Sequence, residues 1–280
     1  MKDFFTKFNF ASGKNVFFFN KKIIDIKKSE IKFIKENFLD KSQYHLVIKN
    51  LGKSTTEIKK NVIHFTKIFG KLVKQDKHGK LIVKIKYNVK KIKEKKIKKK
   101  EINLRYHQSN TGGYIHSDGP QLENPPKYVM MACVNKAEKG GYSILSSIEK
   151  ILFYLKRYDK KNLSILKKDF YFEKRGFYYK NQSKVHKKPV IQYYDKDFRF
   201  RYLRDYMNHA YKIKSLKLSK SQTKALNELD SLLSKKKYQL RYKLEEGDML
   251  LLNNFKIAHG RSPFKLKEKN NRSLIRAWFR

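Results

Sequence analysis

The chain has 280 residues and a formal net charge of +43, carried by 57 lysines and only 11 arginines. The lysines are spread along the chain and accompany abundant Ile, Asn, Phe and Tyr, as an A/T-rich coding sequence would produce, which argues against nucleic acid as a partner. A single cysteine, Cys133, excludes an intramolecular disulfide, and the lack of both an apolar run of about 18 residues and a signal-peptide pattern predicts a cytoplasmic protein that does not cross a membrane.

The N-terminal part, residues 1–103, is predicted to contain helices and strands that buttress a core. One helix is predicted from Ser54 to Gly70, because Ser54 and Glu57 form a capping-box pattern and glycine is a common helix stop. Alternating apolar and charged residues over 80–87 predict a strand. Three histidines of this part are interpreted as packing residues rather than ligands: His45, His64 and His78.

Residues 104–280 show short apolar segments separated by Gly, Pro and Asn turns, a pattern that favours a β-sandwich or jelly roll. Two helices are predicted within this part, with capping-box patterns that begin at Ser146 and Ser219. The aromatic-rich stretch 170–211 between them is interpreted mainly as strands. Because no repeat or linker divides the chain, we predict one domain over 1–280, of the α+β class and mainly β, with a double-stranded β-helix (jelly-roll) core and flanking helices.

The C-terminal segment has a clearer pattern. Residues 249–252 are predicted as a buried strand between two turns, a further strand is predicted to begin over 257–259, and 273–279 is predicted as a closing strand. This segment therefore supplies the distant strands that a jelly roll brings next to the middle of the chain.

A candidate metal site consists of His116, Asp118 and His259. In an extended segment residues two apart project to the same side, so His116 and Asp118 can reach one ion while Ser117 points away. His259 lies 143 residues downstream (259 minus 116) and must come from another strand. Two histidines and one carboxylate are the ligand set of non-heme Fe(II) oxygenases, although a short His-x-Asp motif by itself also occurs by chance.

Arg272 follows the second histidine and is the candidate for co-substrate binding. The chain contains about five lysines for each arginine, so an arginine at this position indicates a need for its planar guanidinium group. A buried guanidinium binds a dicarboxylate such as 2-oxoglutarate in a bidentate manner. The arginine and the candidate metal ligands together predict an oxygenase.

These motifs form an ordered set that resembles the Fe(II)/2-oxoglutarate-dependent oxygenases of the taurine dioxygenase and γ-butyrobetaine hydroxylase group, over roughly residues 104–280. The set is His116-Ser117-Asp118-Gly119, Pro125-Pro126-Lys127-Tyr128-Val129, Gly140-Gly141-Tyr142-Ser143, Gly247-Asp248 through Asn254 to His259-Gly260-Arg261, and Arg272. The resemblance implies Fe(II), 2-oxoglutarate and O2 as cofactor and co-substrates, and release of succinate and CO2 during hydroxylation or desaturation of a small molecule. It also implies His116, Asp118 and His259 as iron ligands.

For the remaining residues the resemblance implies that Arg272 binds the far carboxylate of 2-oxoglutarate and that Ser143 supplies a hydroxyl to it. Arg276 stands where taurine dioxygenase binds the sulfonate of its substrate, which indicates an anionic substrate group, although a surface ion pair is an alternative. His107 and Asn110 precede the metal motif and are candidates to line the substrate pocket. Arg261 is as compatible with a structural role as with a substrate contact.

Two other functions compete with this interpretation. One is a related oxygenase that acts on a macromolecule and uses the basic surface for docking. The other is a non-catalytic basic protein that binds polyanions, in which the three candidate ligands are coincidental. The sequence is also compatible with a homo-oligomer.

Overall fold

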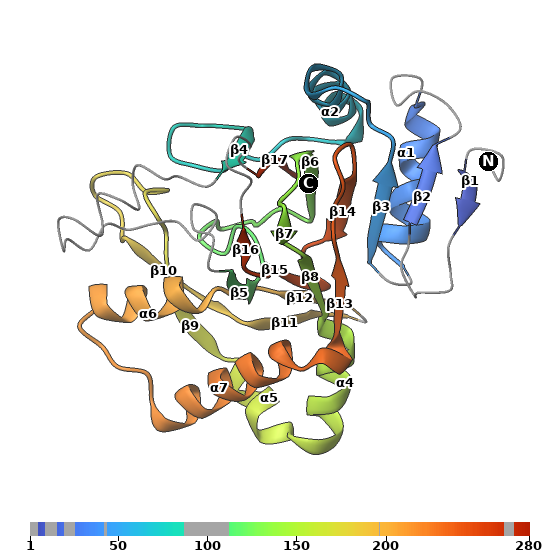
Figure 1. The fold of residues 1–280 in the computed structure, drawn as a ribbon. Helices are drawn as coiled ribbons and strands as arrows, with labels where there is room; N and C mark the ends of the chain where they lie inside the picture. The colour runs from blue at the N-terminus through green and yellow to red at the C-terminus, as the bar shows by residue number, and fades with distance from the viewer. Residues whose placement is uncertain are drawn as a thin grey trace.

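The computed structural model describes residues 26–41, 44–86, 112–195, 197–265 and 272–280, together with the backbone of two N-terminal strands, β1 (Phe5–Phe8) and β2 (Val16–Phe19). Two sheets face each other, and helices cover the outer side of each (Figure 1). Among the described residues, no helix is both long and apolar enough to cross a membrane.

The larger sheet has seven strands in the order β1-β2-β3-β14-β6-β17-β4. Its other strands are β3 (His45–Lys49), β4 (Ile82–Lys86), β6 (Tyr128–Asn135), β14 (Met249–Asn253) and β17 (Ser273–Phe279). The pairs are antiparallel except β2 with β3. β6 and β14 lie inside the sheet and are buried on both faces, which explains their continuous apolar sequences.

The smaller sheet has four strands in the order β13-β8-β15-β5, all antiparallel. They are β5 (Gly113–His116), β8 (Ser143–Ser147), β13 (Gln239–Tyr242) and β15 (Ile257–Arg261). One apolar cluster joins the two sheets, with Val129 and Leu250 from the larger sheet and Leu145 and Ile257 from the smaller one.

The outer face of the larger sheet is covered by α2 (Thr55–Phe69) and by α1 (Lys28–Ile34), which continues as the π-helical turn η3 (Lys35–Leu39) (Figure 1). Ser54 caps α2 by accepting a hydrogen bond from the backbone N–H of Glu57, as predicted. The second half of the predicted capping box differs, because the Glu57 carboxylate accepts from the N–H of Lys53 instead of Ser54. The predicted strand over 80–87 is present as β4.

Helices gather against the smaller sheet at the other end of the molecule (Figure 1). They are α4 (Ile148–Tyr158), α5 (Lys160–Leu166), α6 (Arg204–Ile213) and α7 (Lys220–Ser234), followed by the short η5 (Lys236–Tyr238). The capping box of Ser219 and Gln222 is confirmed, whereas α4 is capped by Ser147, the last residue of β8, instead of Ser146. Two predicted helices are therefore present, and α5 and α6 were missed.

The stretch 170–211 contains two hairpins and one helix. The hairpins are β9 (Asp169–Glu173) with β10 (Val185–Pro189) and β11 (Ile191–Tyr194) with β12 (Asp197–Phe200), and a further short pair is formed by β7 (Lys139–Gly140) and β16 (Phe264–Lys265). The prediction of strands here is confirmed up to Phe200, and α6 follows them. Helices occupy nearly as many described residues as strands do, so the fold is mixed rather than mainly β.

Candidate metal centre

His116, Asp118 and His259 converge on one point between the sheets. His116 ends β5 and is the direct cross-strand partner of His259 in β15. The Nε2 atoms of the two rings lie 3.6 and 3.7 Å from the two carboxylate oxygens of Asp118, and one ligand atom from each of the three residues lies within 4.8 Å of the others. All three side chains are buried. The triad could hold one metal ion, as the sequence predicts.

The two imidazoles are prepared to act as ligands. Nδ1 of His116 lies 2.8 Å from the carbonyl oxygen of Tyr114, so a neutral ring donates its proton there and leaves the lone pair on Nε2, towards Asp118. Burial lowers the pKa of His259, although the Asp118 carboxylate acts in the opposite direction. A neutral ring keeps a lone pair free for a metal, and the donor set is therefore suited to a divalent transition-metal ion.

The backbone of Asp118 is fixed by Asn254, which is fully buried. The Asn254 side chain accepts from the Asp118 N–H at 2.7 Å and donates to the Asp118 carbonyl at 2.8 Å. Its amide also donates to the carbonyl of Pro126 at 2.9 Å. Gly119 follows with φ +72°, and a Cβ there would lie 2.5 Å from the Pro126 ring, so the turn after the ligand requires glycine.

The carboxylate of Asp118 is held by two donors from β17. Nη1 of Arg276 lies 3.0 and 3.2 Å from its two oxygens, and the indole N–H of Trp278 donates to Oδ2 at 2.8 Å. Burial alone raises the pKa of Asp118, but the adjacent Arg276 guanidinium and the neighbouring histidines outweigh it and hold the pKa well below its usual range. The carboxylate is therefore ionised, as metal binding requires.

Arg272 lies directly before β17 and is buried, with its guanidinium carbon 5.4 Å from the centre of the Phe264 ring. Gly141 has φ +71°, and a Cβ at that position would lie 3.2 Å from Nε of Arg272, so the backbone packs tightly against this arginine. Ser143 begins β8, is buried, and is the cross-strand partner of Arg261. A buried guanidinium of this kind has the chemistry that a carboxylate ligand needs.

Several predicted residues have other surroundings. Arg276 contacts Asp118, and its predicted contact with substrate stays a prediction. His107 and Asn110 lie outside the described residues. Cys133 is buried, and burial raises the pKa of its thiol to about 12 although Arg272 acts in the opposite direction. His45 is buried and His64 partly buried, whereas His78 is exposed, so its interpretation as a packing residue was wrong.

Sequence reasoning missed a clamp on the loop that follows Asp118. The buried guanidinium of Arg201 donates to the carbonyls of Pro120, Leu122 and Glu123 at 3.0, 2.6 and 2.9 Å. The next residue, Tyr202, exchanges two 2.8 Å hydrogen bonds with Ser117, one through the Ser117 hydroxyl and one through its N–H. Residues 201 and 202 therefore fix both Ser117, between the two ligands, and the loop that follows Asp118.

The spacing of Arg199, Arg201 and Arg204 in the sequence predicts an alternating basic strand, and this prediction is wrong. Only Arg199 lies in β12, where its guanidinium carbon is 4.5 Å from the centre of the Phe255 ring. Arg204 begins α6 and pairs with Asp230 at 2.9 Å. The strand ends at Phe200, because the chain turns there to bring Arg201 against the metal loop.

Replacing Arg201 with methionine should lower the free energy of unfolding by about 3 kcal/mol, since one buried and two part-buried hydrogen bonds from a charged donor are lost. Urea denaturation of the metal-free protein measures this change. Arg241→Met is the matched control, because Arg241 is exposed on β13 and its replacement should change stability by less than about 0.5 kcal/mol. Equal stability of the two variants would show that the clamp is not a stabilising contact.

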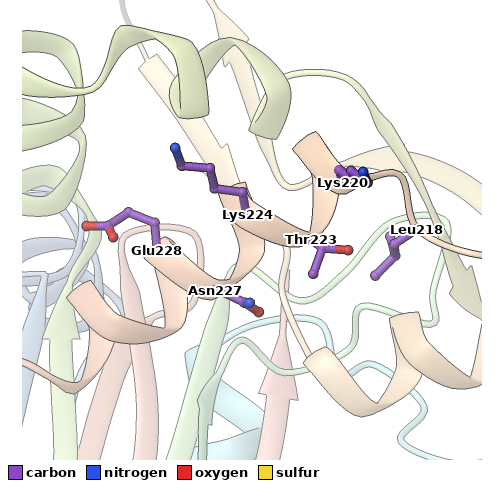
Figure 2. A pocket seen from close by; sticks show the side chains of 6 residues that line it. All are labelled: Leu218, Lys220, Thr223, Lys224, Asn227 and Glu228. Atoms are coloured by element: carbon purple, nitrogen blue, oxygen red, sulfur yellow. The ribbon is translucent and has the colours of Figure 1, made fainter.

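A surface hollow of about 490 Å³ lies along α7 (Figure 2). It is lined by Leu218, Lys220, Thr223, Lys224, Asn227 and Glu228. None of the residues predicted for the metal or co-substrate lines this hollow, and no role in the site is assigned to it.

Two histidines on neighbouring strands of the smaller sheet, with one carboxylate just after β5, define the class of mononuclear metal centres with open coordination positions. The chain matches the family described as taurine catabolism dioxygenase TauD, TfdA family, over residues 47–278, and it belongs to that family. The resemblance inferred from the sequence motifs is confirmed. The match begins in β3, so it includes much of the N-terminal part that showed no diagnostic motif.

Known proteins similar to this chain are oxygenases. The γ-butyrobetaine dioxygenases of Homo sapiens and Pongo abelii are each 26% identical over 169 residues, which is 59% of this chain and 43% of theirs, so the match covers less than half the length of these relatives. An asparagine oxygenase in complex with Fe(II), 2S,3S-3-hydroxyasparagine and succinate has a TM-score of 0.67 at 13% identity, covering 90% of this chain and 78% of that one. The non-heme iron oxygenase OrfP in complex with Fe and alpha-ketoglutaric acid has a TM-score of 0.64 at 12% identity, covering 92% and 81%.

Proposed function

We propose that the protein is an Fe(II)- and 2-oxoglutarate-dependent dioxygenase that hydroxylates, or desaturates, a small molecule. The observation that carries this proposal is the buried convergence of His116, Asp118 and His259, with an ionised carboxylate and a neutral His259. Family membership supports it, because the family is described as dioxygenases. We also propose that the two facing sheets form a double-stranded β-helix within one domain.

In this proposal the three residues hold Fe(II), and Arg272 binds the far carboxylate of 2-oxoglutarate with help from the Ser143 hydroxyl. The bound iron and 2-oxoglutarate supply the activation of O2 for oxidation of a substrate C–H bond, with release of succinate and CO2. The chain contributes the fixed orientation of the ligands through Asn254 and Arg276, and the burial that excludes water.

A small-molecule substrate is supported by the relatives. The names of the similar proteins refer to γ-butyrobetaine, hydroxyasparagine and hydroxylated arginine, which are small amino or ammonium acids. Substrates of this chemical type are therefore the first to test here. The two alternatives are an oxygenase that acts on a macromolecule and a non-catalytic protein that binds polyanions.

The test is an anaerobic titration of the purified protein with Fe(II) and then 2-oxoglutarate, followed by visible absorption. A charge-transfer band that requires both components is the expected result, and it justifies screening of amino acids by succinate release in air. No band at saturating iron would overturn the proposal, and steeply salt-dependent binding of a polyanion would then favour the non-catalytic alternative.

A further inference from the structure

We propose, on the basis of the iron centre inferred above, that Gln75 is a positioning residue of that centre. It would hold Arg276 in the orientation in which the arginine fixes the Asp118 carboxylate. Gln75 lies between α2 and β4, in the part of the chain for which the sequence predicts only a buttress, and it is 43 residues before Asp118 (118 minus 75). The N-terminal part thus contributes to the chemistry of the site as well as to its support.

The side-chain amide of Gln75 has one possible orientation. Its Nε2 donates to the carbonyls of Leu81 at 2.8 Å and Arg276 at 3.0 Å, which uses both amide hydrogens. Its Oε1 then accepts from Nε of Arg276 at 2.8 Å. A flipped amide would place its hydrogens against the guanidinium and its oxygen against two carbonyls, so the flip is disfavoured. The side chain is buried, with 4% of its surface exposed, which makes these bonds hard to replace by water.

The guanidinium of Arg276 is held by contacts with three other side chains. Its Nε is held by Gln75, its Nη1 by both oxygens of Asp118, and its plane lies 4.7 Å from the centre of the Trp278 ring. An arginine fixed at three points is a rigid support for a carboxylate. Without Gln75 the guanidinium loses the hydrogen bond that sets the rotation of its plane about the Cδ–Nε bond.

The two oxygens of Asp118 are distinguished by this support. Oδ1 accepts from Arg276 and faces His116 Nε2 at 3.6 Å, while Oδ2 accepts from both Arg276 and Trp278 and faces His259 Nε2 at 3.7 Å. Rotation of the carboxylate would break both arrangements. Outer partners that orient a metal ligand are worth about 10–100-fold in metal affinity.

This role differs from a contact between Arg276 and the substrate, because it acts when no substrate is present. The test is therefore binding of Fe(II) alone, under anaerobic conditions, to Gln75→Met, which keeps the length of the side chain and changes no charge. Trp278 is the only tryptophan of the chain and donates to Asp118, so its fluorescence emission follows the titration directly. We expect the dissociation constant for Fe(II) to rise about tenfold.

Two further variants make the result specific. Gln75→Glu keeps an oxygen for Arg276 but sets its second oxygen against the carbonyls of Leu81 and Arg276, so it should melt at a lower temperature and yet bind Fe(II) more tightly than Gln75→Met. Gln239→Met removes a partly buried glutamine on β13 that donates to the Leu233 carbonyl at 2.8 Å, far from the network in sequence, and should not change affinity. Circular dichroism and the melting temperature of each metal-free variant separate lost affinity from lost fold.

The outcomes are distinct. If wild type binds iron and Gln75→Met binds it equally well, with or without a lower melting temperature, Gln75 is only structural and the positioning role is overturned. The same conclusion holds if Gln239→Met weakens binding as much as Gln75→Met does. If wild type itself binds no iron, the proposed function fails first, and this result is recognised without any variant.

Discussion

Replacing His259 with alanine should abolish the charge-transfer band and raise the dissociation constant for Fe(II) by more than about 100-fold. Loss of a residue that only orients a metal ligand lowers metal affinity by about 10–100-fold. His259 is itself one of the three candidate ligands among the described residues, so its loss should have a larger effect. Anaerobic titration with iron and 2-oxoglutarate measures the change.

The matched control is His209→Ala, because His209 lies on α6 with 45% of its side chain exposed and pairs with Glu173. It should bind iron as wild type does. A normal band in the His259→Ala protein would remove His259 from the ligand set and would contradict the proposed centre.

Replacing Arg272 with leucine should raise the concentration of 2-oxoglutarate needed for half-saturation by about 100-fold, while affinity for Fe(II) alone stays unchanged. Charge-assisted hydrogen bonds contribute about 1.5–3 kcal/mol each, and about 2.7 kcal/mol corresponds to this factor. The charge-transfer band measured against 2-oxoglutarate concentration gives the result.

Arg272→Lys should fall between wild type and Arg272→Leu, since an ammonium keeps the charge without the planar fork. Arg241→Leu, at an exposed position of β13, is the control that should leave half-saturation unchanged. An Arg272→Leu protein with wild-type half-saturation would assign co-substrate binding to other residues, and a loss of iron binding without co-substrate would assign Arg272 to the metal site instead.

The sequence predicts the metal centre well because its evidence is local. His116 and Asp118 are two residues apart in extended backbone, and the buried strand before His259 has a continuous apolar sequence. The helix α6 was missed because strand-forming aromatic residues precede it closely and Arg199 and Arg201 suggest continued alternation. Local pattern cannot reveal that the chain turns after Phe200 to place Arg201 against a loop 80 residues away (201 minus 121).

The support of the ligands could not be predicted, for a different physical reason. Gln75 meets Arg276 across 201 residues of sequence, and Trp278 meets Asp118 across 160. Such contacts depend on which strands are neighbours and on side-chain direction, neither of which a single residue or its spacing encodes. Buried polar groups must find partners, so a buried glutamine indicates a specific contact. That Gln75 is buried is known only once the structure around it has been described.

The place of β17 in the larger sheet has a consequence for how the protein folds. β17 follows all other described elements in sequence, yet it lies between β6 and β4 and carries both donors to Asp118. Pairing between elements so distant in sequence gives a high contact order, which slows folding. Both donors to Asp118 are in place only when β17 has paired with β6 and β4, so the metal centre should form late in folding, after these long-range strand pairs.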